Sequence, residues 1–186
     1  RAKIVYGDLS PRQIVLTPAG TAVLPMPGLR PIVRPVEGYA DAGLLPEVYD
    51  YLAAERIAAG TRADVRSDLY ACGAVWWHLL AGRPPIAGAS GLAKLRGAQT
   101  QKIIDIQQLA PDTPPRLARA IGRCLERDPT RRPASFAELG EMLAAGAPEA
   151  RKAVVRSIVR QQTQAAAAPA VLDRSWLPSA SKRLIA

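Results

Sequence analysis

The sequence contains few side chains whose chemistry could support catalysis or metal binding. Its single histidine, His78, and its two cysteines, Cys72 and Cys124, lie within apolar helical patterns. Such residues are ordinarily part of a protein core, and their spacing matches no metal-binding motif. Asp8 lies in a Gly-Asp-Leu-Ser-Pro loop, and the next carboxylate along the chain is Glu37. The sequence therefore predicts no metal centre, buried free thiols and a core histidine, with Asp8 as an isolated acid.

The N-terminal part of the chain predicts a small hairpin followed by a long loop. Residues 3–16 hold two apolar runs on either side of the Asp8 loop, and residues 17–20 form a turn signal before the apolar run 21–24. Residues 25–50 contain five prolines and three glycines. Proline blocks helix across most of this segment, which we expect to be irregular.

Helices dominate the rest of the chain. The segment Asp68–Leu80 is almost wholly apolar, as expected of a helix at the centre of a fold. Ser67 or Asp68 can cap its start, and Gly82 followed by prolines ends it. Further helices are predicted within Ser90–Gln108, over Pro115–Arg127, over Ser135–Ala145 with a Ser135/Glu138 capping box, and over Pro148–Gln164.

Five local signatures occur in order along the chain. They are Tyr6-Gly7-Asp8-Leu9-Ser10, Met26-Pro27-Gly28, Tyr51-Leu52-Ala53-Ala54-Glu55, Asp64–Pro85, and Asp128-Pro129-Thr130-Arg131-Arg132-Pro133. In this order they resemble the catalytic loop, the Asp-Phe-Gly segment, the Ala-Pro-Glu segment, the central helix and the turn before the last helix in the C-terminal (large) lobe of a bacterial serine/threonine protein kinase. The resemblance implies a mainly α fold with a small β-hairpin at its start.

The resemblance also implies structural roles for four residues. The acid at Asp68 would hold the backbone of the catalytic loop, and a buried carboxylate needs such hydrogen bonds. Glu55 and Arg132 would form a bidentate clamp between the activation segment and the last helices. Gly28 would correspond to the glycine of the Asp-Phe-Gly segment and have a structural role there.

The positions that would handle phosphate and metal depart from the family pattern. Asp8 keeps the catalytic-base position, but Ser10 replaces a lysine and Gln13 replaces a magnesium-binding asparagine. Met26 stands where a magnesium-binding carboxylate belongs, and a thioether is a poor ligand for that cation. The resemblance therefore implies no active catalytic residue, no bound cofactor and no metal.

The expected function is accordingly a non-catalytic, pseudokinase-type scaffold subunit of a larger assembly, with no small lobe in this chain. An alternative is the C-terminal fragment of a longer serine/threonine kinase with weak or no ATP phosphotransfer. A second alternative is a basic-tail binder of nucleic acid or an anionic membrane surface.

Charge and composition set the expected partners and location. The chain has a net charge of +9, and residues 147–186 carry seven basic residues against two acids. We expect residues 1–146 to form the lobe, with the loop remnant at 3–16, the activation-like loop at 25–55 and the helical bundle at 56–146. Residues 147–186 would be a basic helix and tail that meet an acidic surface of a protein partner through Arg151, Arg156, Arg160 and Trp176. Nucleic acid is a less favoured partner because residues 1–146 lack the interleaved aromatic side chains on which bases stack.

The sequence has no apolar run long enough for a transmembrane segment, and a cytoplasmic location is expected.

Overall fold

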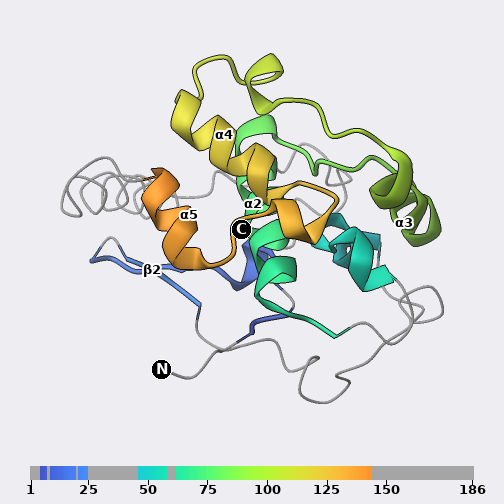
Figure 1. The fold of residues 1–186 in the computed structure, drawn as a ribbon, viewed down its shortest axis with the longest axis horizontal. Coiled ribbons are helices and arrows are strands. Elements are labelled where there is room, and N and C mark those ends of the chain that lie inside the picture. Colours follow the sequence, from blue (N-terminus) through green and yellow to red (C-terminus); the bar gives the residue numbers. More distant parts are fainter. Residues whose placement is uncertain (1–4, 8, 20, 25–45, 58–61, 144–186) are drawn as a thin grey trace, which may run out of the picture. The chain divides into compact units, whose positions relative to one another are not determined.

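The structure is a computed structural model that describes residues 5–7, 9–19, 21–24, 46–57 and 62–143 (Figure 1). The chain divides into two compact units, one formed by residues 1–15 and 22–146 and the other by residues 16–21 and 147–186. The helices described below all belong to the first unit.

The N-terminal elements are short. A 3-10 helix, η1 (Pro11–Gln13), is followed by the strands β1 (Val15–Leu16) and β2 (Ala22–Val23), which are paired in a two-stranded sheet. In the turn, the Thr17 N–H donates to the Thr21 carbonyl at 2.9 Å. The hairpin predicted from the turn signal is confirmed.

Two further 3-10 helices, η3 (Pro46–Tyr51) and η4 (Ala54–Ile57), precede the central helix α2 (Val65–Ala81). The helix starts earlier than predicted because Asp64 is its N-cap: its carboxylate accepts from the Ser67 N–H at 2.8 Å, and the Ser67 hydroxyl accepts from the Asp64 N–H at 3.0 Å. Gly82 ends the helix, as predicted, with a left-handed φ of 72° that suits glycine.

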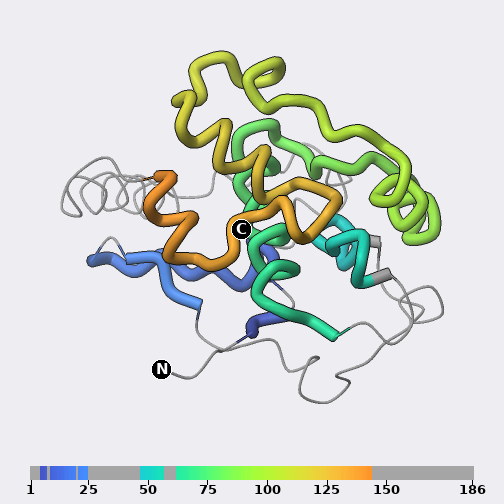
Figure 2. The backbone as a smooth tube through the Cα atoms, in the orientation of Figure 1, coloured from blue at the N-terminus to red at the C-terminus, as the bar shows by residue number. Residues whose placement is uncertain are grey.

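The remaining helices follow in the predicted order. They are α3 (Gly91–Thr100), the 3-10 helix η5 (Ile106–Gln108), α4 (Pro115–Cys124), the 3-10 helix η6 (Pro129–Arg131) and α5 (Phe136–Leu143). Figure 2 traces the chain from the end of α2 out to α3 and back to α4. The Ser135 hydroxyl accepts from the Glu138 N–H, as the predicted capping box requires. The Glu138 carboxylate, however, accepts from the N–H of Ala134 and not from that of Ser135.

The core forms where α2 packs against α4 and α5 (Figure 1). Buried side chains from these helices include Leu69, Val75, Trp77, Ile121, Cys124 and Leu139. Gly73 lets the two longer helices approach closely, since a Cβ at this position would lie 2.6 Å from the Cβ of Cys124. This core holds the two buried charged groups, Asp68 and Arg132, on which the candidate site depends. In the described part of the chain, no helix is both long and apolar enough to span a membrane.

Candidate functional site

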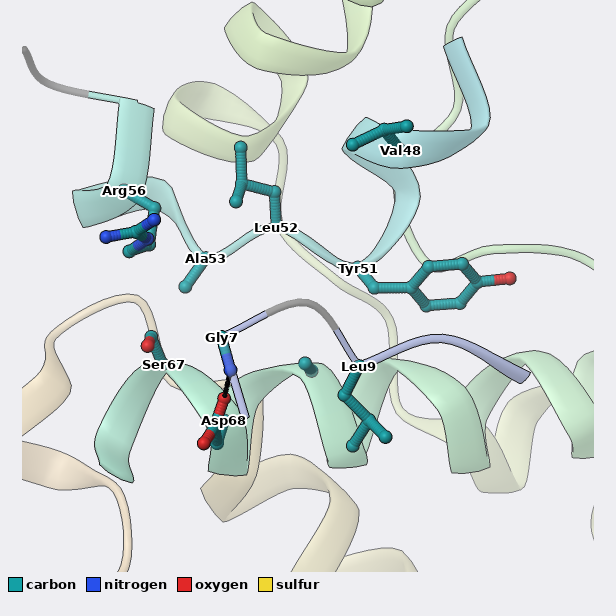
Figure 3. Close-up of a pocket in the computed structure, with 10 residues that line it drawn as sticks. Gly7, Leu9, Val48, Tyr51, Leu52, Ala53, Arg56, Ser67 and Asp68 are labelled. Carbon is teal, nitrogen blue, oxygen red and sulfur yellow. Dashed lines mark hydrogen bonds between the residues drawn. The ribbon is translucent and has the colours of Figure 1, made fainter. Parts of the chain in front are cut away.

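Asp68 joins the central helix to the first loop. Its carboxylate is buried, and its two oxygens accept hydrogen bonds from the backbone N–H groups of Tyr6 at 2.6 Å and Gly7 at 2.7 Å. Figure 3 shows the Gly7 bond. The pKa of Asp68 is raised above its ordinary value, chiefly by burial, and the two N–H donors and the positive charge of Arg56 offset only part of this rise. The carboxylate therefore acts as a fixed acceptor that sets the position of the loop backbone.

Gly7 suits the geometry that this contact needs. Its φ is 76°, in the left-handed region where any other residue is strained by about 1–3 kcal/mol. In this conformation the successive N–H groups of Tyr6 and Gly7 reach the two oxygens of one carboxylate. The next residue in the sequence is Asp8, so the loop backbone is fixed directly before that acid.

Ser10 and Gln13, the two substituted positions in this loop, bond to each other. The Gln13 side-chain oxygen accepts from the Ser10 N–H at 2.8 Å and lies 3.3 Å from the Ser10 hydroxyl. That oxygen is the atom that would have to bind magnesium. Among the described residues, no cluster of three or more His, Cys, Asp or Glu side chains could hold a metal ion. The described part of the loop therefore does not fit a magnesium site.

Arg132 forms the second buried tie of the site. Its Nη1 and Nη2 donate to the two carboxylate oxygens of Glu55 at 2.6 and 2.8 Å, and its side chain is fully buried. Its guanidinium also lies over the ring of Tyr70, 4.9 Å from the ring centroid. Further donations go to the backbone carbonyls of Glu126 (2.7 Å), Arg66 (3.0 Å) and Arg127 (3.2 Å). The clamp thus fixes η4 against the turn between α4 and α5.

A hydrogen bond between Tyr51 and His78 is a contact that the sequence analysis did not anticipate. The Tyr51 hydroxyl lies 2.7 Å from His78 Nδ1, and the two rings are stacked with a centroid separation of 6.0 Å. Burial is the main reason that the pKa of Tyr51 is raised. His78 is half-buried rather than enclosed in the core, and it ties the end of η3 to α2. The all-apolar appearance of the helix around His78 concealed this role.

A buried ion pair between Lys94 and Asp50 was also missed. The Lys94 ammonium lies 2.5 Å from Asp50 Oδ1, in a close ion pair without the direction of a hydrogen bond, and both side chains are largely buried. Beside it, the Tyr49 ring packs on Gly91, where a Cβ would come within 2.7 Å of the ring. No local sequence pattern links residues 49–50 with α3, so only the tertiary structure could have identified this pair.

Arg56 completes the junction between these segments. It is 3% exposed and, with Asp68, lines a small cavity of about 20 Å³ that is bounded by the first loop, η3 and α2 (Figure 3). A cavity of this size and polarity can hold one water molecule. The loop, the end of η3 and the central helix therefore meet around one buried acid and one buried base.

Several residues singled out from the sequence lie outside the described part of the chain. They are Asp8, Met26, Gly28, Arg151, Arg156, Arg160 and Trp176. The expected basic helix over 148–164 and the activation-like loop between residues 25 and 45 lie outside it as well. Of the remaining predicted site residues, Asp68 contacts the first loop, Glu55 pairs with Arg132, and Ser10 pairs with Gln13.

Comparison with known proteins gives the same family as the local motifs. Residues 1–143 match the family model described as protein tyrosine and serine/threonine kinase. The DNA damage-responsive serine/threonine-protein kinase RqkA of Deinococcus radiodurans is 32% identical over 141 residues, which are 76% of this chain and 21% of that protein. The serine/threonine-protein kinase pkn2 of Myxococcus xanthus is 29% identical over 153 residues, covering 76% of this chain and 18% of the relative. PknL of Mycobacterium tuberculosis, a serine/threonine-protein kinase, is 28% identical over 151 residues, which are 80% of this chain and 37% of that protein. The chain thus spans well under half the length of these relatives.

These matches correct the expectation that the chain is not part of an enzyme. The relatives are named serine/threonine protein kinases, which points to kinase activity. The expectation of an inactive pseudokinase is therefore wrong. That expectation rested on the substitutions at Ser10, Gln13 and Met26 and on the lack of a small lobe in this chain. Phosphoryl transfer is mainly a matter of positioning and charge stabilisation by many groups, so single substitutions are a weak guide to its loss.

Proposed function

The chain belongs to the protein tyrosine and serine/threonine kinase family, and from this premise we propose that it is the large lobe of a serine/threonine protein kinase. The reaction would transfer the terminal phosphoryl group of ATP to a serine or threonine hydroxyl of a protein. Support comes from the names of the relatives and from the two buried ties that hold the loop before Asp8 and the segment around Glu55. Because the chain spans only part of its relatives, the activity is proposed for a full-length protein that contains this lobe.

The observation that carries the proposal is the pair of hydrogen bonds from Tyr6 and Gly7 to Asp68. They fix the loop backbone one residue before Asp8, from a helix that is itself buried in the core. A general base must be held within hydrogen-bond reach of the proton that it removes. A loop fixed in this way can present Asp8 to a substrate hydroxyl without rearrangement during the reaction.

In the proposed reaction, the carboxylate of Asp8 accepts the proton of the attacking hydroxyl. The hydroxyl oxygen forms a bond to the terminal phosphorus while the bond from that phosphorus to the bridging oxygen breaks, releasing the nucleoside diphosphate. The tied segments η3 and η4 would form the part of the lobe that faces the protein substrate. We propose that most contacts to the nucleotide come from the part of the full-length protein that this chain does not include.

The test is a phosphotransfer assay on the full-length protein with a general protein substrate and ATP, followed by detection of phosphoserine and phosphothreonine. Asp8→Asn should lower the rate by about a hundredfold or more, the usual contribution of general acid–base catalysis. Asp112→Asn, at an exposed turn before α4, is the matched control and should leave the rate unchanged. Equal rates for the Asp8→Asn variant and the unmodified protein would remove Asp8 from the mechanism.

A role in protein–protein contact within a larger assembly is proposed in addition. It is supported by apolar side chains of the hairpin segment that are partly exposed: Val15 (48%), Val23 (38%) and Leu24 (45%). Groups of exposed apolar side chains commonly mark an interface. Sedimentation of the full-length protein tests this role. Val23→Glu and Leu24→Glu are the disrupting variants, and Leu92→Glu on α3 is the control.

The two free cysteines are compatible with a reducing compartment, and we propose a cytoplasmic location.

A further inference from the structure

Five charged side chains are buried in the described part of the chain: Asp50, Arg56, Asp68, Lys94 and Arg132. Lys94 forms an ion pair with Asp50. Arg132 forms one with Glu55. The remaining two are Arg56, which is 3% exposed, and Asp68, which is 4% exposed. Burying a charge is costly unless an opposite charge or hydrogen bonds compensate it, so a base and an acid that are both this deeply buried are expected to compensate each other.

Arg56 and Asp68 line the same small cavity (Figure 3). It has a volume of about 20 Å³, and Arg56 of η4, Asp68 of α2 and Gly7 of the first loop meet at it. A cavity of this size holds about one water molecule, so little bulk water screens the two charges from each other. Charges interact more strongly in such surroundings than at the surface. Burial raises the pKa of Asp68, and the positive charge of Arg56 offsets part of this rise.

The attachment of η4 to the core does not explain the burial of Arg56. The Glu55 carboxylate already ties this 3-10 helix to Arg132. The Arg56 N–H donates to the Ala53 carbonyl at 2.9 Å, which closes the turn locally. The Arg56 guanidinium could lie in solvent without loss of either contact. Its enclosure beside Asp68 instead brings a positive charge to the carboxylate that holds the first loop.

The other titratable groups around Asp68 do not supply this charge. Asp64, one turn earlier on α2, is a second negative charge and adds to the rise in the pKa of Asp68 that burial causes. Cys72, one turn later, has its own pKa raised to about 12, chiefly by burial, and stays neutral near pH 7. Tyr51, which also lines the cavity, has a raised pKa as well, again chiefly because of burial. Among the described residues, Arg56 is thus the positive charge that acts on this carboxylate.

The charge of Asp68 matters because its carboxylate serves two donors at once. One oxygen accepts from the Tyr6 N–H at 2.6 Å and the other from the Gly7 N–H at 2.7 Å. In a protonated carboxyl group, one oxygen carries a hydrogen and becomes a donor that would face an N–H group. Protonation would therefore leave the loop backbone held at one oxygen only, directly before Asp8.

We propose that Arg56 is a positioning residue for phosphotransfer, which keeps Asp68 in the charged form that holds the loop leading into Asp8. The inference rests on the proposed function, since it assigns Arg56 a part in the same reaction. Arg56 would act through Asp68 and not on the substrate. A displacement of about 1 Å can lower a rate about a hundredfold, so a charge behind the loop has a measurable effect on catalysis.

The test measures kcat and KM of the full-length protein with ATP and a protein substrate at about pH 6 and about pH 8. We expect Arg56→Met to lower kcat at least about tenfold while KM changes less than about threefold. The loss should be larger at the lower pH, because the pKa of Asp68 rises further without the positive charge of Arg56. Arg56→Lys keeps the charge and should restore most of the rate. Arg62→Met removes an exposed arginine and is the matched control, which should leave kcat unchanged.

A double variant distinguishes positioning through Asp68 from a general structural role. In an Asp68→Asn background, which has no carboxylate at this position, Arg56→Met should change kcat less than about twofold. An equal loss in both backgrounds, or a loss of the same size at both pH values, would overturn the proposal. Thermal unfolding checks that each variant is folded, and Arg56→Gln takes the place of Arg56→Met should that variant not fold.

Hydrogen exchange at residues 5–13 gives a second readout that does not depend on catalysis. At neutral pH, Arg56→Met should speed exchange there at least about tenfold, because an uncompensated buried carboxylate holds the loop less firmly, and it should add little to Asp68→Asn. If the unmodified full-length protein transfers no phosphoryl group, the proposed function fails, and the exchange result alone supports or overturns the role of Arg56 in holding the loop. If phosphotransfer occurs but neither kcat nor exchange responds to Arg56→Met, the proposed function stands and this inference fails.

Discussion

The core of α2, α4 and α5 and the segment of residues 5–24 are held in different ways. In the core, Trp77 and Ile121 are fully enclosed, and Arg132 makes five separate donations to Glu55 and to backbone carbonyls. In the segment 5–24, the strands have two residues each, and Val15 and Leu24 remain nearly half exposed. Asp68 links the core to this segment by accepting hydrogen bonds from the backbone N–H groups of Tyr6 and Gly7.

The difference indicates which part of the lobe is a rigid support and which part needs further contacts. A region with many buried, mutually supporting interactions unfolds only with the whole domain, whereas a region with few buried contacts opens locally. The four predictions below test this contrast, from the largest expected effect to the smallest.

Replacing Arg132 by Met should cause the largest loss of stability. The change leaves the Glu55 carboxylate and three backbone carbonyls without their donor in a buried site, and breaking a buried ion pair by removing one partner costs about 3–5 kcal/mol. Urea unfolding monitored by tryptophan fluorescence gives the free energy of unfolding. Arg131→Met is the control, because the neighbouring side chain is 72% exposed. Similar losses in the two variants would show that the clamp does not stabilise the core.

Replacing Asp68 by Asn should release the first loop. One of the two acceptors becomes an NH₂ group facing a backbone N–H, and hydrogen bonds to a charged group contribute about 1.5–3 kcal/mol each. We expect hydrogen exchange at residues 5–13 to speed up by more than an order of magnitude, with a smaller change in the core helices. Asp112→Asn is again the exposed control. If exchange increased uniformly over α2 and α4 instead, the loop would be part of the core and the contrast would be wrong.

Alkaline pH should destabilise the core without breaking any specific tie. Burial raises the pKa of Cys124 to about 12 from 9.0, and the pKa of Tyr70 to about 12 from 10.0. These groups keep their protons in the folded state at a pH where the unfolded chain loses them, so stability falls as pH rises above about 9. At pH 10.5 the loss due to Cys124 is about 2 kcal/mol. Urea unfolding at pH 8.0 and 10.5 measures it, and Cys124→Ala should show a smaller difference between the two pH values.

Replacing Tyr51 by Phe should have the smallest effect. The change removes the hydroxyl that bonds to His78 and keeps the stacked ring, so a loss of about 1 kcal/mol is expected. Thermal unfolding at neutral pH measures it. His78→Phe keeps an aromatic ring on α2 but removes the same hydrogen bond. Because both changes remove one shared bond, the double variant should lose less stability than the sum of the two single losses. If Tyr51→Phe lost several times the expected stability, η3 would be held mainly by this hydrogen bond rather than by its packing on α3.

Much of the lobe could be predicted from local sequence. The almost wholly apolar run Asp68–Leu80 located α2, and the period of apolar residues located α4 and α5. Gly82 located the end of α2. These signals could be found because each depends on near neighbours along the chain. The Asp68 tie and the Glu55–Arg132 clamp could be suggested because a family motif carries each of them. The start of α2 was placed too late because Asp64 and Ser67 cap each other, which a search for a single cap residue does not reveal.

Other contacts were decided only by the tertiary structure. The Asp50–Lys94 pair, the Tyr51–His78 bond and the burial of Arg56 join segments whose separation in sequence follows no helical or strand period. Each depends on which side chains happen to face one another once α2 and α3 are packed. The sequence by itself thus determined the helices and the family of this protein. Only the tertiary structure decided how the segment around residues 49–56 is held, because long-range pairing of buried charges leaves no local pattern.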